Sequence, residues 1–134
     1  MKLIPYIMMC IIACLPAPLL QAQERDIKEE IYQQAEKEAD KLQRVLDLEY
    51  WQTFYVDSTL KHDYIAMYTE SERLKESKVS SERLYIDVQD RWMDKIDETF
   101  KRIFTQEQWA AYLKGGAAKA QKARAKRKAQ AEGK

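Results

Sequence analysis

The sequence predicts an all-α fold, namely an elongated bundle of three to four amphipathic helices. The 134-residue chain has no proline after residue 18, and its three glycines stand at positions 115, 116 and 133. Residues between these limits are rich in leucine, glutamate, lysine, glutamine and arginine, which favour helix. No long run alternates apolar and polar residues with the period of two that a half-buried strand shows.

Residues 1–22 have the order of a secretory signal peptide. Lys2 supplies a positive charge, residues 3–13 form a mostly apolar run, and prolines then precede Ala22. The apolar run is shorter than the roughly 20 residues that a membrane-spanning helix needs. We therefore expect cleavage after Ala22 and a periplasmic or secreted protein.

Both cysteines, Cys10 and Cys14, lie in this leader. Because Cys14 follows the sequence Ile-Ile-Ala, the alternative is a lipoprotein that is anchored at Cys14. Cleavage after Ala22 would leave a chain without thiols, which excludes disulfides, thiolate metal sites and cysteine nucleophiles from that chain.

Several helical segments are expected in the domain at residues 23–114. The first covers about residues 24–46, where apolar residues recur every three or four positions, and the second covers about residues 48–75. Asp47 is a candidate N-cap for the second segment, although the two segments could also form one continuous rod. A third helix is expected over about residues 80–103, starting at one of two serines, and a fourth follows it.

Residues 115–134 form a basic tail that we expect to be flexible or transiently helical. The tail has almost no large apolar residue with which to bury a face of its own. Its cations could contact an anionic membrane surface or fold back on the acidic residues 23–40, and export argues against a nucleic-acid partner. The candidate contacts are Lys122, Arg124, Lys126, Arg127 and Lys128.

Residues 105–108 have the S/T-x-x-E/Q form of a capping box. In such a box the Thr105 hydroxyl accepts from the Gln108 N–H, and the Gln108 side chain accepts from the Thr105 N–H. Phe104 and Trp109 flank the box at the two positions of a hydrophobic staple. We interpret Phe104, Thr105, Gln108 and Trp109 as a structural helix start that needs no ligand.

The stretch Phe104–Gln108 also resembles the LTXXQ motif of the Spy/CpxP-like periplasmic proteins, with Phe in place of Leu. That family usually has two copies of the motif, and Leu48–Gln52, which lies 56 residues earlier, keeps the Leu and the Gln. Glu49 replaces the threonine there, so a second capping box is not expected. The resemblance implies thin, curved, all-α homodimers in the periplasm. It also implies ATP-independent chaperones, stress-signalling inhibitors or metal-sensing relatives, with the matched residues acting as structural caps.

No residue pattern in the sequence specifies a reaction or a cofactor. His62 is the one histidine, and Ser58 and Ala66, one helical turn away on either side, are not good metal ligands. Acidic pairs such as Asp94 and Asp97 lie on charged helices, where ordinary ion pairing is the expected role. The sequence contains no nucleophile elbow, phosphate loop or metalloprotease motif. We therefore predict a protein that is not an enzyme and that uses neither a metal nor a cofactor.

Tyr50, Trp51, Phe54 and Tyr55 stand within about two helical turns of one another. A small chain could bury them as its core, but Tyr and Trp also bind partners well because they bury a large area at little entropy cost. We take these four residues as candidate partner-binding aromatics. The predicted function is a small exported helical binding protein of chaperone-like type, a homodimer that holds unfolded or envelope proteins. The alternative is a structural helical dimer of the cell envelope with no client-holding activity.

Overall fold

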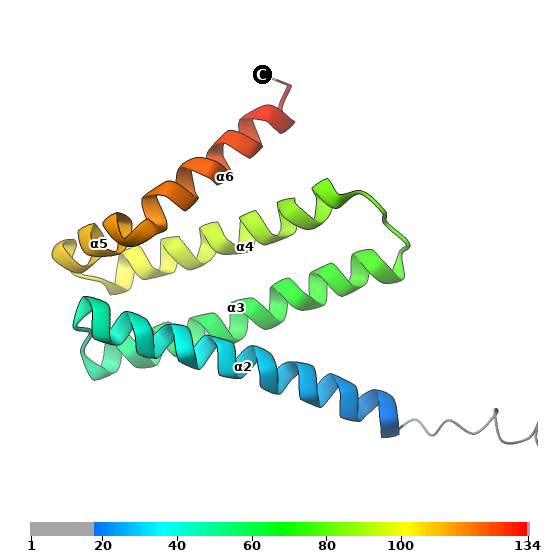
Figure 1. Cartoon of the computed structure of the whole chain (residues 1–134), viewed down its shortest axis with the longest axis horizontal. Coiled ribbons are helices and arrows are strands. Elements are labelled where there is room, and N and C mark those ends of the chain that lie inside the picture. The colour runs from blue at the N-terminus through cyan, green and yellow to red at the C-terminus, as the bar shows by residue number, and fades with distance from the viewer. Residues whose placement is uncertain (1–17, 134) are drawn as a thin grey trace, which may run out of the picture. The chain divides into compact units, whose positions relative to one another are not determined.

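The structure, a computed structural model, describes residues 18–133, and predictions that rest on residues 1–17 lie outside it. Within the described range the chain forms helices and no strand, which confirms the all-α class (Figure 1). The elements in chain order are α2 (Pro18–Leu46), α3 (Tyr50–Glu76), α4 (Glu82–Ile103), α5 (Gln106–Tyr112), the π-helical turn η1 (Leu113–Ala117) and α6 (Ala118–Ala131).

Helix α2 begins at Pro18, a residue suited to the first helical position because it lacks an N–H that would need a partner. The predicted cleavage site after Ala22 falls inside this helix. Of the described residues, 18–30 belong to one unit, and residues from Ile31 onward belong to a second. In the first unit the side chains of residues 21–26 are exposed.

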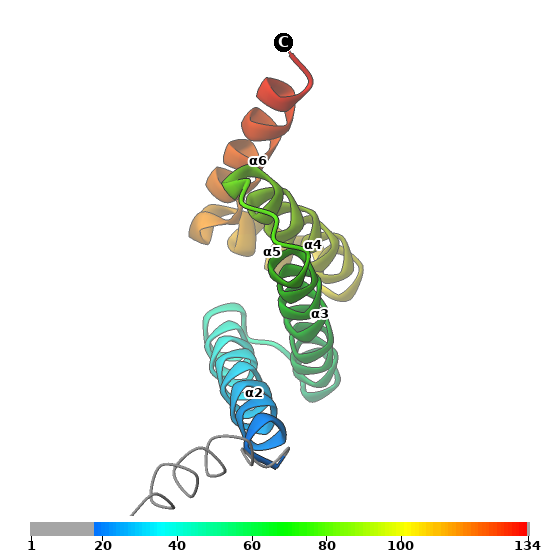
Figure 2. The ribbon, with the colours of Figure 1, turned by 90° about the vertical axis from the view of Figure 1, so that its right-hand side faces the viewer.

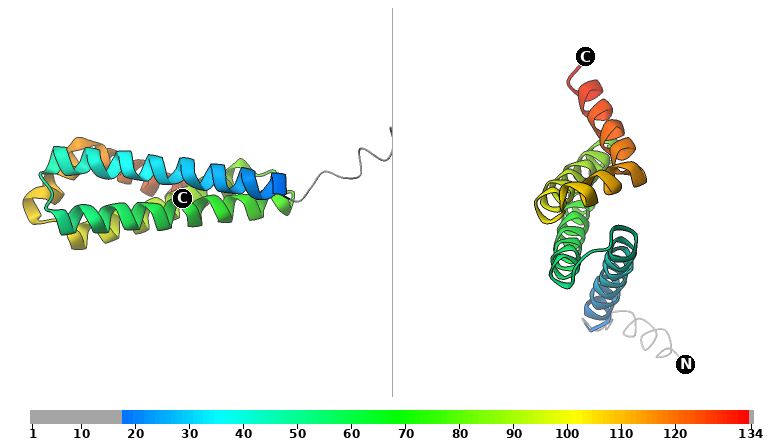
Figure 3. Two further views of the ribbon diagram at one scale, coloured as in Figure 1. Left: turned by 90° about the horizontal axis from the view of Figure 1, so that it is seen from below. Right: turned by 90° about the vertical axis from the view of Figure 1, so that its left-hand side faces the viewer.

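The core of the second unit is built from α2, α3 and α4. Helices α3 and α4 run antiparallel and contact each other (Figures 1 and 2). From Ile31 onward α2 lies beside α3 (Figure 3), and Lys61 Nζ on α3 reaches Glu36 Oε1 on α2 at 2.8 Å. The buried apolar residues form one cluster, consisting of Ala35, Ala39, Leu42, Leu46, Leu48, Val56, Leu60, Ile96, Phe100 and Phe104.

The chain breaks between α2 and α3, so the two helices are not one rod. Asp47 has a φ of 51°, in the left-handed region that aspartate tolerates better than most residues. Glu49, and not Asp47, is the N-cap of α3, and it forms a capping box with Gln52. Gln52 Oε1 accepts from the Glu49 N–H at 2.9 Å. The site thus has the arrangement of a capping box where none was expected: the bond from the Glu49 N–H to Gln52 forms, whereas the Glu49 carboxylate makes no cap hydrogen bond to the helix.

Polar contacts fasten the α3–α4 hairpin close to its turn. Helix α4 starts after Ser81, one of the two predicted serines, and the Tyr85 hydroxyl donates to the Val79 carbonyl at 2.8 Å. Glu70 on α3 accepts from Arg91 at 2.5 Å and from the Trp92 indole N–H at 2.8 Å. These two donors, Arg91 more than Trp92, lower the pKa of the Glu70 carboxyl.

Helix α5 begins with the capping box at Thr105. Thr105 Oγ1 accepts from the Gln108 N–H at 3.2 Å, and Gln108 Oε1 accepts from the Thr105 N–H at 3.0 Å. Phe104 is buried and Trp109 is half-buried, and their rings lie 5.6 and 5.5 Å from the Tyr112 ring, between centroids. The two staple positions therefore meet around Tyr112, in the core next to the helix start.

Replacing Thr105 by alanine should lower the free energy of unfolding by about 1 kcal/mol, because the Gln108 N–H loses its acceptor. Urea denaturation of the variant and the parent measures the difference. Thr99→Ala on α4 is the matched control, since that hydroxyl only bonds the Lys95 carbonyl of its own helix. Equal stabilities for the Thr105 and Thr99 variants would show that the box contributes nothing.

Candidate functional site

The largest side chains that the structure leaves in solvent gather at the start of α3. Tyr50, Trp51, Phe54 and Tyr55 are between 51% and 90% exposed, and we call them the aromatic face. Val45, near the end of α2, is 65% exposed. All four predicted partner-binding aromatics are thus on the surface, and none of them belongs to the buried core.

The helical period explains why these aromatics are exposed. Gln52, Val56 and Leu60 recur every four residues, and all three are buried towards the core. At 3.6 residues per turn Tyr50 and Phe54 lie on the opposite side of α3. The side of α3 that carries Gln52, Val56 and Leu60 already packs in the core, so the aromatic face is an additional apolar surface on the same helix.

The rings of the aromatic face support one another. The centroids of Trp51 and Tyr55 are 6.3 Å apart, those of Phe54 and Tyr55 are 5.7 Å apart, and both pairs meet edge to face. The Trp51 indole N–H donates to Glu49 Oε2 at 2.6 Å, which ties the ring to the helix cap. Such a surface offers apolar area together with polar tips, which suits reversible binding of a protein segment.

A pair of glutamines fixes the helix that carries the aromatic face. Gln52 Nε2 donates to Gln108 Oε1 at 2.6 Å, and Gln108 Nε2 donates back to Gln52 Oε1 at 3.2 Å. Gln52 Nε2 also bonds the Ile103 carbonyl at 3.1 Å, and Gln108 Nε2 bonds the Asp47 carbonyl at 3.3 Å. The two capping boxes, one at the start of α3 and one at the start of α5, are therefore joined through their glutamines.

The structure places His62 on the surface of α3, with its side chain 77% exposed. Its Nδ1 lies 2.7 Å from Asp63 Oδ1, although residues adjacent on a helix were expected to point apart. Among residues 18–133 no group of three His, Cys, Asp or Glu side chains is arranged to hold a metal ion.

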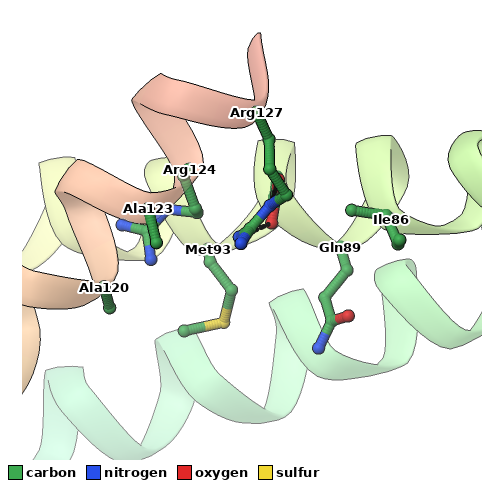
Figure 4. Close-up of a pocket in the computed structure, with 8 residues that line it drawn as sticks. Ile86, Gln89, Met93, Ala120, Ala123, Arg124 and Arg127 are labelled. Carbon is green, nitrogen blue, oxygen red and sulfur yellow. Dashed lines mark hydrogen bonds and ion pairs between the residues drawn. The ribbon is translucent and has the colours of Figure 1, made fainter. Parts of the chain in front are cut away.

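The basic tail is a docked helix, which corrects the expectation of a flexible or transiently helical segment. Three residues of α4 that we call the aspartate row face three residues of α6 that we call the arginine row. The aspartate row is Asp90, Asp94 and Asp97, and the arginine row is Gln121, Arg124 and Arg127. These bonds place the tail on α4, and Figure 4 shows two of its arginines, Arg124 and Arg127, reaching towards α4.

Arg124 is the centre of this contact and is 6% exposed. Its guanidinium donates to Asp94 Oδ1 at 2.6 Å and to Asp97 Oδ2 at 2.5 Å, while Arg127 holds both oxygens of Asp90 at 2.7 and 2.8 Å. Burial opposes the charge on Arg124, but its hydrogen bonds to Asp94 and Asp97 still raise its pKa. The ion pairs provide the docking that the alanine-rich helix cannot obtain from apolar burial.

Asp97 also joins α6 to the core through Tyr112. The Tyr112 hydroxyl donates to Asp97 Oδ1 at 2.7 Å, and Gln121 Nε2 donates to Asp97 Oδ2 at 3.0 Å. Burial first, and then the hydrogen bond to Asp97, raise the pKa of the Tyr112 hydroxyl. Of the predicted tail contacts, Arg124 and Arg127 are occupied by α4, whereas the lysines Lys122, Lys126 and Lys128 remain in solvent.

Comparison of this chain with protein-family models, with curated proteins and with solved structures gave no match. Across the described residues, no helix combines the length and the apolar character that crossing a bilayer requires.

Proposed function

We propose that this protein is a small exported helical binding protein that holds unfolded or envelope proteins without ATP, in the manner of Spy/CpxP-like chaperones. The aromatic face carries the proposal, because four large rings stand in solvent on a helix whose opposite side already fills the core. The joined glutamines of the two LTXXQ-like stretches support the kinship, since both stretches serve as linked helix starts.

The size of the aromatic face favours weak and replaceable contacts. Four aromatic rings that each add about 100 Å² to a contact would gain roughly 10 kcal/mol at about 25 cal/mol per Å². Association itself costs an estimated 4–15 kcal/mol or more, which consumes most of that gain. A stable, specific partner normally covers about 800 Å² on each side, so transient clients fit this surface better.

Replacing Tyr50 and Phe54 together by serine should weaken client protection, because these rings are the most exposed of the face. We expect the full chain to slow the aggregation of reduced, denatured lysozyme in the absence of ATP. The double variant should need at least about five times more protein for the same delay, an affinity loss of about 1 kcal/mol. Light scattering of the client over time measures the delay.

Leu84→Ser is the matched control, because Leu84 is a large apolar residue that is 44% exposed on α4, outside the aromatic face. It should leave the delay unchanged. If the parent chain fails to slow aggregation at every salt concentration, the chaperone proposal is wrong. Equal losses for the Leu84 and aromatic variants would instead show that the aromatic face has no special role.

A second candidate use of the same surface is self-association. Two copies that bury their aromatic faces against each other would form a structural homodimer with no client-holding activity. Sedimentation of the Tyr50→Ser/Phe54→Ser variant distinguishes the two uses, because only a dimer through this face would dissociate on substitution.

A third candidate use is peripheral binding to a membrane, in which the solvent-facing lysines of α6 would contact anionic lipid headgroups.

A further inference from the structure

Helix α6 is held on α4 by polar contacts and by little apolar surface. The arginine row bonds the aspartate row, but a groove of about 430 Å³ remains between the helices, lined in part by Ile86, Met93, Ala120 and Ala123 (Figure 4). The attraction within a buried ion pair is largely offset by the cost of removing its charges from water. The contact is therefore specific, and its net stability is modest.

Gly116 sets the direction in which α6 leaves α5. Its φ of 128° and ψ of −16° are not helical, whereas the chain on both sides of it is helical. A Cβ atom added at Gly115 or at Gly116 would meet no other atom within 4 Å. The obstacle to alanine at position 116 is thus the conformation of the backbone, which L residues avoid.

Helical angles at Gly116 would make residues 106–131 one continuous helix of roughly 39 Å. The arginine row would then leave the α4 of its own chain, and Arg124 and Arg127 would lose their carboxylate partners. A second copy of the chain offers the same aspartate row, so mutual exchange of α6 restores each of these contacts without any new surface.

We propose that Gly116 is a hinge through which two copies of this chain exchange α6, so that the arginine row of each copy docks on the aspartate row of the other. The closed and the exchanged states contain the same α4–α6 contacts. They differ in the conformation of the hinge and in the entropy cost of association, so the backbone preference at position 116 decides between them. This exchange uses residues outside the aromatic face and does not depend on the function proposed above.

Gly116→Ala and Gly115→Ala test the hinge as a matched pair. Both substitutions raise helix propensity in open space, but only position 116 has a positive φ that alanine avoids. Light scattering of the full chain over a concentration series gives the dissociation constant of self-association. We expect a decrease of at least about tenfold for Gly116→Ala and of less than about twofold for Gly115→Ala.

A second pair of variants, built into the Gly116→Ala chain, tests whether the arginine row makes the new contact. Arg124→Gln/Arg127→Gln should return self-association to that of the parent chain. Lys122→Gln/Lys126→Gln removes the same charge from residues that face solvent and should leave the association intact. Circular dichroism of each variant confirms that it remains helical.

Two results would overturn the proposal. One is a Gly116→Ala chain that associates no more than the Gly115→Ala chain, and the other is an equal effect of the arginine and lysine pairs. Adding Tyr50→Ser/Phe54→Ser to Gly116→Ala should leave the tenfold effect in place. Failure of the aromatic face as a binding surface is therefore measured separately from failure of the hinge.

Discussion

Replacing Gln52 by leucine is expected to lower the free energy of unfolding by about 3 kcal/mol, as measured by urea denaturation. The Gln52 side chain is 2% exposed, and its amide bonds the Glu49 N–H, the Ile103 carbonyl and the Gln108 amide. Leucine keeps the size of the side chain and loses these bonds. Each polar group that is left without its hydrogen-bond partner costs about 1 kcal/mol. Three groups lose Gln52 as a partner, namely the Glu49 N–H, the Ile103 carbonyl and the Gln108 amide, which gives about 3 kcal/mol.

Gln106→Leu is the control for this substitution, because Gln106 is an exposed residue in the first turn of α5. It should change the stability by less than about 0.5 kcal/mol. The double variant Gln52→Leu/Gln108→Leu should cost less than the sum of the two single variants, since the two amides bond each other. Strict additivity would mean that the glutamines cap their helices independently.

The helices themselves could be predicted, because their evidence lies within single segments of the sequence. Apolar spacing located each long helix, Ser81 marked the start of α4, and Thr105 to Gln108 form the box that the sequence pattern describes. A capping box closes over four consecutive residues, so its partners are visible without a tertiary structure. The sequence also identifies the four clustered aromatics as candidates for binding. Their exposure depends on which side of α3 faces the neighbouring helices, and only the tertiary structure shows that.

The contacts between distant segments could not be predicted in the same way. The bond between Gln52 and Gln108 joins residues 56 positions apart, and neither residue type indicates such a partner. The docking of α6 had a readable signal, because Asp90, Asp94 and Asp97 are spaced by four and three on one face of α4. Ordinary ion pairing is the role that the sequence predicts for acidic pairs such as Asp94 and Asp97, but Asp97 is buried and its cation, Arg124, lies on another helix.

Replacing Asp97 by alanine should release α6 from α4, because this carboxylate accepts hydrogen bonds from Tyr112, Gln121 and Arg124. Hydrogen bonds to charged groups contribute about 1.5–3 kcal/mol each. Breaking a buried ion pair costs about 3–5 kcal/mol when the remaining charge stays trapped. In this protein the Arg124 charge does not stay buried, because α6 is a terminal helix that carries Arg124 into water when it undocks. The cost of losing Asp97 is therefore below that range.

The loss of Asp97 should therefore appear as local opening more than as global unfolding. We expect amide hydrogen exchange over residues 118–131 to accelerate by about thirtyfold, which corresponds to about 2 kcal/mol of docking free energy. The amides of α3 should keep their protection. Once free, a helix of 14 residues with no packed face is marginal in water, so its own hydrogen bonds do not restore protection.

Asp87→Ala is the matched control for this experiment, because Asp87 is an exposed aspartate on the same helix whose oxygen lies 3.6 Å from Arg83. Surface ion pairs of this kind contribute at most about 1 kcal/mol, so exchange in α6 should not change. If Asp97→Ala destabilises α3 and α6 equally, α6 unfolds together with the core and is not a separately docked helix. Selective exposure of α6 would instead show that the core remains folded when the tail leaves it, a condition that the hinge at Gly116 requires.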